Sequence, residues 1–109
     1  MDPKLEVLFN PGTVALIGAT LREGSVSAVI TRTLLEEFRG GVYLVNPSYN
    51  ELLGRKVYKS ILDIPGNVDL AIIVTPAPTV PRIMRECAMK GVRVAIIISG
   101  GFSERGIWR

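Results

Sequence analysis

The stretch Thr13-Val14-Ala15-Leu16-Ile17-Gly18-Ala19-Thr20-Leu21-Arg22-Glu23-Gly24-Ser25-Val26 decides the fold of this chain. Its first part, 14–18, is an apolar run that ends in glycine, as is typical of a strand buried on both faces. A polar loop with a second glycine, Gly24, follows, and Ser25 occupies the position of a helix N-cap. Loop N–H groups and the positive end of a helix dipole meet over such a strand end. The stretch therefore predicts an anion site, which we interpret as the holder of nucleotide phosphates.

The remaining chain alternates between helical and strand patterns. Apolar periodicity predicts helices over 25–39 and 80–90 and strands over 42–45, 69–74 and 92–98. In the first helix the apolar pattern runs through Val26, Val29, Ile30, Leu34 and Phe38. In the second helix one face carries Val80, Ile83, Met84 and Cys87. Between these elements, 53–58 is expected to be a loop with at most a short strand, and Ser60 to cap a single turn over 61–64.

This alternation predicts an α/β fold. Continuous apolar strands separated by helices, joined by right-handed crossovers, form a Rossmann-like doubly wound parallel sheet covered on both faces. The 109 residues are expected to make a single domain. Residues 1–10 are expected to be an N-terminal arm, and 102–109 an incomplete C-terminal extension.

The composition of the chain excludes several classes of ligand, partner and chemistry. The net charge of +3 suits an anionic small ligand and is too weak and scattered to favour nucleic acid. No apolar run is long enough to span a membrane, so no membrane partner is expected. The single cysteine, Cys87, excludes an internal disulfide and predicts a reducing, cytoplasmic location. Histidine is absent, which removes the commonest general base and most zinc sites, so reacting groups are expected to come from elsewhere.

Small, polar or proline residues follow all four predicted parallel strands. They are Gly18-Ala19-Thr20, Asn46-Pro47, Thr75-Pro76-Ala77 and Ser99-Gly100-Gly101. In a doubly wound sheet these segments share the carboxyl edge, where ligands bind. Each segment also has a plain interpretation as an ordinary turn or strand exit. Their coincidence at one edge favours a binding site.

The details argue against NAD as the ligand. The dinucleotide fingerprint G-x-G-x-x-G is missing, because Ala19-Thr20 follows Gly18 and the next glycine is Gly24. An acid after the second strand would hold the ribose hydroxyls of a dinucleotide, but Asn46-Pro47 stands there. An NAD(H)-binding module stays open as an alternative.

The sequence resembles the CoA-binding domain that opens the NDP-forming acyl-CoA synthetases, such as ADP-forming acetyl-CoA synthetase and the succinyl-CoA synthetase α subunit. The resemblance covers nearly the whole chain, from Leu8 to Gly106, through the order and spacing of short blocks. The blocks are Phe9-Asn10-Pro11, 14–20, Gly24-Ser25-Val26, 42–47, Leu53-Gly54, Val57-Tyr58, 68–74 and 98–106.

The resemblance implies that coenzyme A lies across the carboxyl edge. The residues implied to hold the phosphates and the adenosine side are Gly18, Ala19, Thr20, Gly24, Ser25 and Val26. Asn46 and Pro47 are implied to line the ribose and adenine pocket. The segments implied to guide the pantetheine arm are Thr75, Pro76 and Ala77 together with Ser99, Gly100 and Gly101.

The chain departs from the family at two positions. Ser27 stands where many relatives carry glycine, and Ser48 where many carry a basic residue just after Asn-Pro. The second departure leaves the 3′-phosphate to another cation, and Arg22, Arg55 and Lys56 are the candidates. The family's phosphorylated histidine and its ATP-grasp site lie in further domains or subunits, which are the implied partners.

The chain alone is therefore not expected to run the family's reaction. That reaction converts acyl-CoA, ADP and phosphate to acid, CoA and ATP. A stand-alone CoA-binding protein with a regulatory or carrier role is the other interpretation, and the acyl group is not encoded in this stretch.

Overall fold

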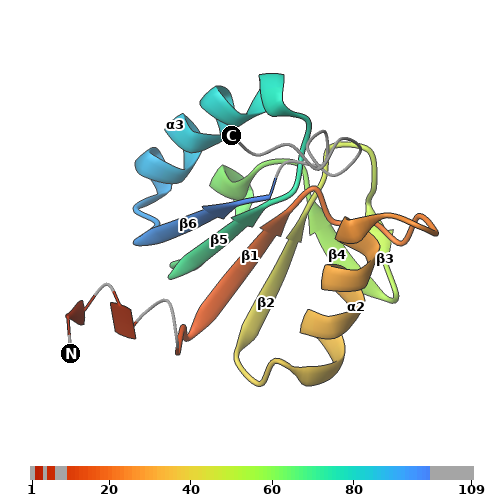
Figure 1. The fold of residues 1–109 in the computed structure, drawn as a ribbon, viewed down its shortest axis with the longest axis horizontal. Helices are drawn as coiled ribbons and strands as arrows, with labels where there is room; N and C mark the ends of the chain where they lie inside the picture. The colour runs from red at the N-terminus through yellow and green to blue at the C-terminus, as the bar shows by residue number, and fades with distance from the viewer. Residues whose placement is uncertain (1, 4, 7–9, 99–109) are drawn as a thin grey trace.

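The computed structural model describes residues 2, 3, 5, 6 and 10–98. Its centre is one sheet in the order β3-β4-β2-β1-β5-β6 (Figure 1). The strands are β1 (Thr13–Ile17), β2 (Gly41–Val45), β3 (Glu51–Leu52), β4 (Arg55–Tyr58), β5 (Leu70–Ile73) and β6 (Val94–Ile97). All neighbouring strands pair in parallel except β3, which is antiparallel to β4. The expected Rossmann-like parallel sheet is confirmed.

Helices cover both faces of the sheet. Helix α2 (Val26–Glu37) lies over one face, near β2 and β4, and helix α3 (Val80–Lys90) lies over the other, near β5 and β6 (Figure 1). Two short 3₁₀ turns, η1 (Ile61–Asp63) and η2 (Ala77–Thr79), precede β5 and α3. Ser60 caps η1 as expected, and Gly91 ends α3 in the left-handed conformation.

The segment 53–58, expected to be a loop with at most a short strand, holds strand β4 and the turn that joins it to β3. Strands β3 and β4 meet at Leu53 and Gly54, whose φ angles are 51° and 75°. Positive φ at both central residues is the signature of the tight turns that suit a hairpin's twist. Asparagine or aspartate before glycine is the usual sequence signal. Because Leu53 occupies that position here, the turn could not be predicted from the sequence.

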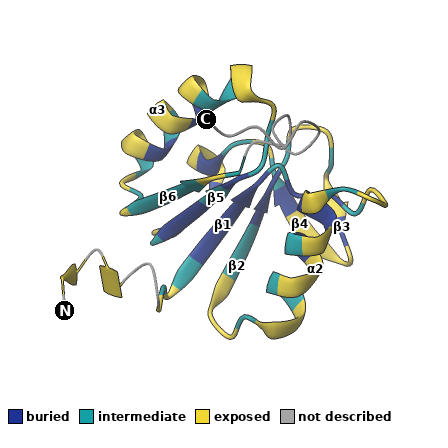
Figure 2. Ribbon diagram, in the orientation of Figure 1, coloured by how far each residue is buried: buried dark blue, intermediate teal, exposed yellow. Residues whose placement is uncertain are grey.

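The core has one layer on each side of the sheet. Figure 2 shows buried residues along the central strands β1 and β5. The α3 side is larger and gathers Ala15, Ile17, Val45, Ile61, Ile64, Val68, Ala71, Ile73, Ile83 and Cys87. The α2 side gathers Leu16, Ala19, Leu44, Leu52 and Val57.

The apolar pattern of the first helix is confirmed in part, because Ile30 and Leu34 pack against the core while Val26 and Val29 do not. Val29 is 64% exposed and Val26 is 46% exposed, whereas α2 buries the small residues Ser27, Ala28 and Thr31. Small side chains let the helix backbone approach the strand ends closely. The short distance between helix and sheet, more than hydrophobicity, therefore decided which residues of α2 face the sheet. In α3, Met84 is also corrected, since it is 37% exposed while Ile83 and Cys87 are buried.

Cys87 gives the protein a pH dependence in the alkaline range. Its side chain is buried, and burial, followed by the charge of Glu86, raises the thiol pKa from 9.0 to about 11. Between these values the folded chain keeps a proton that the unfolded chain has lost. The free energy of unfolding is therefore expected to be highest below pH 9 and to fall by roughly 2–3 kcal/mol as the pH rises through 11.

Urea unfolding across this pH range tests the effect. The Cys87→Ala variant is the control, because it lacks the thiol while the other alkaline groups titrate as before. Equal pH slopes in the two proteins would contradict the assignment.

No helix in the described part of the chain is both long enough and apolar enough to cross a membrane.

Candidate functional site

The parallel register brings four strand ends together. Ile17 pairs with Val45 and with Ile73, and Val45 pairs with Tyr58. The residues that follow these strands therefore line the same carboxyl edge, which Figure 1 shows as the edge where the arrowheads of β1, β2 and β5 converge. The segments that follow β1, β2 and β5 are those expected from the sequence. Ser99, Gly100 and Gly101, expected after the last strand, lie outside the described residues.

Gly18 is required by the closeness of β1 and β5. Its φ angle is +100°, and a Cβ at this position would lie 2.2 Å from the carbonyl oxygen of Val74. Its N–H donates to the carbonyl of Val45 at 2.8 Å, so this amide is already used within the sheet. Gly18 therefore acts on the site through backbone packing.

The next two residues of the loop are buried and hydrogen-bonded internally. Ala19 is fully buried and its N–H also donates to the carbonyl of Val45, at 3.2 Å. The N–H of Thr20 donates to the hydroxyl of Thr31 at 3.4 Å, and the Thr20 hydroxyl in turn accepts from the N–H of Arg22 at 3.1 Å. The amides of Ala19 and Thr20 thus hold the loop in shape.

The start of α2 offers the amides that the loop does not consume. Ser25 is the N-cap, and its hydroxyl oxygen accepts from the N–H of Ala28 at 3.1 Å. Within the described residues, the N–H groups of Gly24, Val26 and Ser27 have no acceptor. Gly24 has a φ of +84° and no heavy atom within 4 Å of where a Cβ would stand. Free donors, open space and a helix dipole coincide here, which is the arrangement that binds anions.

Two buried hydroxyls, missed from the sequence, fix this helix start. Ser27 donates from its hydroxyl to the carbonyl of Gly18 at 2.5 Å, and Thr31 donates to the carbonyl of Ser27 at 2.8 Å. Thr31 is completely buried. Ser27 was noted only as a departure from the family, yet it joins the helix to the strand end. Its four-residue spacing from Thr31 was the available signal, because both lie on one face of a helix.

Asn46 joins β2 to the glycine loop. Its side-chain amide donates to the carbonyl of Ala19 at 2.9 Å, and its side-chain oxygen accepts from the N–H of Ser48 at 2.8 Å. A second link forms between the hydroxyls of Thr20 and Tyr49, which lie 2.8 Å apart. The segment after β2 is therefore held against the segment after β1, and we call these segments the two walls of the candidate site.

The segment after β5 leads directly into α3. The Thr79 hydroxyl lies 2.8 Å from the Thr75 hydroxyl and 2.6 Å from the carbonyl of Pro76, which closes the turn that carries Pro76 and Ala77. Both Pro76 and Ala77 are exposed. These two residues are accessible from solvent at the carboxyl edge.

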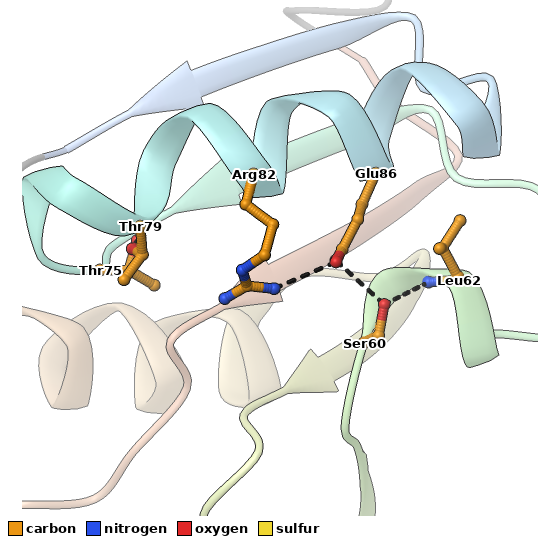
Figure 3. Close-up of polar contacts among 6 residues, drawn as sticks. All are labelled: Ser60, Leu62, Thr75, Thr79, Arg82 and Glu86. Carbon is orange, nitrogen blue, oxygen red and sulfur yellow. Dashed lines mark hydrogen bonds and ion pairs between the residues drawn. The ribbon is translucent and has the colours of Figure 1, made fainter.

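A charged network fixes α3 to the end of β4. Figure 3 shows Glu86 receiving hydrogen bonds from Arg82 and from the hydroxyl of Ser60, each at 3.0 Å. The Ser60 oxygen also accepts from the N–H of Leu62. The network holds the middle of α3 against the segment that follows β4, and no motif in the sequence predicted it. Across the described residues, no cluster of acidic and sulfur ligands suited to a metal ion occurs.

Comparison with known protein families identifies the family of this chain. A family model described as a CoA binding domain matches residues 12–107. The chain belongs to this family. The match includes all of the segments that form the carboxyl edge.

Known relatives of this CoA-binding domain are ADP-forming ligases. It is 52% identical over 103 residues to an acetate–CoA ligase [ADP-forming] I of Archaeoglobus fulgidus, a match that covers 94% of this chain and 15% of the relative. It is 49% identical over 107 residues to the α subunit of acetate–CoA ligase [ADP-forming] I of Pyrococcus furiosus, with 94% of this chain and 23% of the subunit covered. The chain thus spans less than a quarter of the length of these relatives.

A solved structure agrees with these matches. The dinucleotide-forming acetyl-coenzyme A synthetase 1 of Ca. Korarchaeum cryptofilum, in complex with phosphate and ADP, superposes with a TM-score of 0.83 at 40% identity. That likeness covers 94% of this chain and 22% of the synthetase chain. The resemblance inferred from the sequence to NDP-forming acyl-CoA synthetases is confirmed.

Proposed function

We propose that this domain binds coenzyme A along the carboxyl edge of its sheet. The observation that carries the proposal is the group of amides at Gly24, Val26 and Ser27, which have no acceptor among the described residues, together with the open space beside Gly24. The pyrophosphate of CoA supplies the negative charge that these donors and the helix dipole favour. Asn46 and Pro47 form the wall nearest the adenosine, and Thr75, Pro76 and Ala77 form the wall along which the pantetheine arm extends.

The role of the bound CoA follows from the relatives. They are ADP-forming CoA ligases, and this chain covers only a small part of each. The domain holds the nucleotide end of CoA and presents its thiol to further ligase domains or to an ATP-grasp subunit. Because the chain contains no histidine, a phosphorylated histidine must come from such a partner. Conversion of acyl-CoA, ADP and phosphate to acid, CoA and ATP is then a reaction of the assembly.

A second candidate function has a specific observation in its favour. A conserved hypothetical protein of Pyrococcus furiosus superposes with a TM-score of 0.73 at 29% identity, and this chain covers 78% of it. The fold therefore also occurs in a protein not much longer than this chain. A stand-alone carrier or regulatory role would use the same CoA site.

Ligand-dependent melting tests the proposed ligand. A ligand present at about 100 times its dissociation constant stabilises the folded state by roughly 2.7 kcal/mol, which raises the melting temperature of a domain this size by about 10 °C or more. CoA is expected to give this shift and NAD is expected to give none, because no acidic residue stands after β2 to hold the ribose hydroxyls. A shift with NAD and none with CoA would overturn the proposal.

A further inference from the structure

Lys59 is a cation held in position at the proposed CoA site. It follows Tyr58, the last residue of β4, so it stands at the carboxyl edge beside the segment that follows β2. Its ammonium group donates to the carbonyl of Pro47 at 3.1 Å and to the carbonyl of Tyr49 at 3.0 Å. These two bonds leave one of its three N–H donors free.

Within the described residues, no carboxylate forms an ion pair with the ammonium of Lys59. The one ion pair among these residues joins Arg82 and Glu86. Its side chain is exposed and borders a hollow of about 330 Å³. The carboxylate of Asp63 borders the same hollow without pairing with the lysine. An ammonium group that is fixed, accessible and not paired with a carboxylate is suited to binding an anion.

Lys59 is also tied to the two walls of the site. Its partners Pro47 and Tyr49 flank Ser48, on the segment that Asn46 joins to the glycine loop. The Tyr49 hydroxyl contacts Thr20 in that loop. An anionic group on a ligand that lies between the two walls would therefore meet a cation on the β2 side.

The other cationic side chains near this edge are less well placed than Lys59 to bind an anion on the β2 side. Arg55 and Lys56 begin β4, three and two residues before its carboxyl end, which is a distance of about 7–10 Å along the strand. Lys56 borders the same hollow as Lys59, but its ammonium lies over the ring of Tyr58, 5.0 Å from the ring centroid. Arg22 is exposed on the glycine loop, and within the described residues no hydrogen bond or ion pair positions its guanidinium. Arg22 is also on the pyrophosphate side of the site.

We propose that Lys59 recognises the phosphate on the 3′ position of the CoA ribose and so lets the domain prefer CoA to dephospho-CoA. The inference rests on the proposed function. It gives this role to a residue outside the three candidates named from the sequence, which were Arg22, Arg55 and Lys56. The two carbonyl bonds fix the lysine before the ligand arrives, so little side-chain entropy is lost when the phosphate binds.

Calorimetric titration with CoA and with dephospho-CoA isolates this contact, because the two ligands differ only in the 3′-phosphate. The wild-type domain is expected to bind CoA about tenfold more tightly, as one charge-assisted hydrogen bond would give. Lys59→Gln is expected to lose this preference by weakening CoA while dephospho-CoA binds as before. Lys59→Arg is expected to keep the preference, and added salt to reduce it in the wild type.

Lys90→Gln is the matched control. Lys90 also donates from its ammonium to a backbone carbonyl, that of Ile64, but it ends α3 at the opposite edge of the sheet. Its loss is expected to leave the ratio of the two affinities unchanged.

Three results would overturn the proposal. Equal weakening of both ligands by Lys59→Gln would show that the lysine only holds the segment after β2. Loss of the preference in Arg22→Gln, with Lys59→Gln unchanged, would assign the phosphate to Arg22. Equal affinity of the wild type for both ligands would show that the 3′-phosphate is not read, although CoA binding itself would stand. Failure of the wild type to bind either ligand would instead overturn the proposed function, and the role of Lys59 with it.

Discussion

Gly18→Ala is expected to destabilise the fold by about 3 kcal/mol or more. A φ of +100° is reached readily only by glycine, and the added methyl would lie 2.2 Å from the Val74 carbonyl oxygen. That atom belongs to the backbone beside β5, so relief requires the strands to separate. Small domains have only about 5–15 kcal/mol in total, so the loss is a large fraction of the stability.

Urea denaturation with a conservative control measures this loss. Gly24→Ala is the control, because Gly24 also has a positive φ but has no atom within 4 Å of the added methyl. Gly24→Ala is expected to lower the free energy of unfolding by about 1 kcal/mol, because alanine is less stable than glycine at a positive φ and no steric clash adds to this cost. Similar losses in the two variants would show that the close approach of β1 and β5 does not restrict Gly18.

Gly24→Val is expected to abolish CoA binding in a protein that still folds. The branched side chain would occupy the open space beside Gly24, close in sequence to the amides of Val26 and Ser27 that have no acceptor among the described residues, where the pyrophosphate is proposed to lie. We expect CoA affinity to fall about a hundredfold or more, as expected when two or more charge-assisted hydrogen bonds are lost. Calorimetric titration gives the affinity, and a melting curve without ligand confirms that the variant is folded.

Gly54→Val provides the matched control for binding. Gly54 has a φ of +75° and equally open surroundings, but it lies in the turn between β3 and β4. The conformational penalty is therefore similar, while the CoA affinity should not change. Unchanged affinity in Gly24→Val would falsify the placement of the pyrophosphate at the start of α2.

The sequence predicted the parallel sheet because the signals for strands and helices lie in short stretches of the chain. Apolar runs that end in Gly18, Asn46 and Thr75 had to be buried strands, and helices between them required parallel pairing. The Ser25 N-cap was also predictable, since a cap depends on one hydroxyl and the first turn of a helix. These elements are confirmed at nearly the expected bounds.

What the sequence could not show depends on how closely elements approach in space. The apolar residues Val26 and Val29 suggested one face for α2, but the distance between helix and sheet selected the small residues Ser27 and Thr31. The steric requirement at Gly18 arises from Val74, which is more than fifty residues away in the chain. The loop amides likewise found acceptors in β2 and α2, which no pattern within the loop could indicate.

The carbonyl of Val45, which accepts from both Gly18 and Ala19, has a kinetic implication. Together with Asn46 it sets the geometry of the glycine loop before any cofactor is present. Capture of a pyrophosphate at the proposed site would then need no slow ordering of the backbone, so the association rate should depend on diffusion and charge attraction. Residence time would instead depend on how many contacts the far end of the cofactor makes.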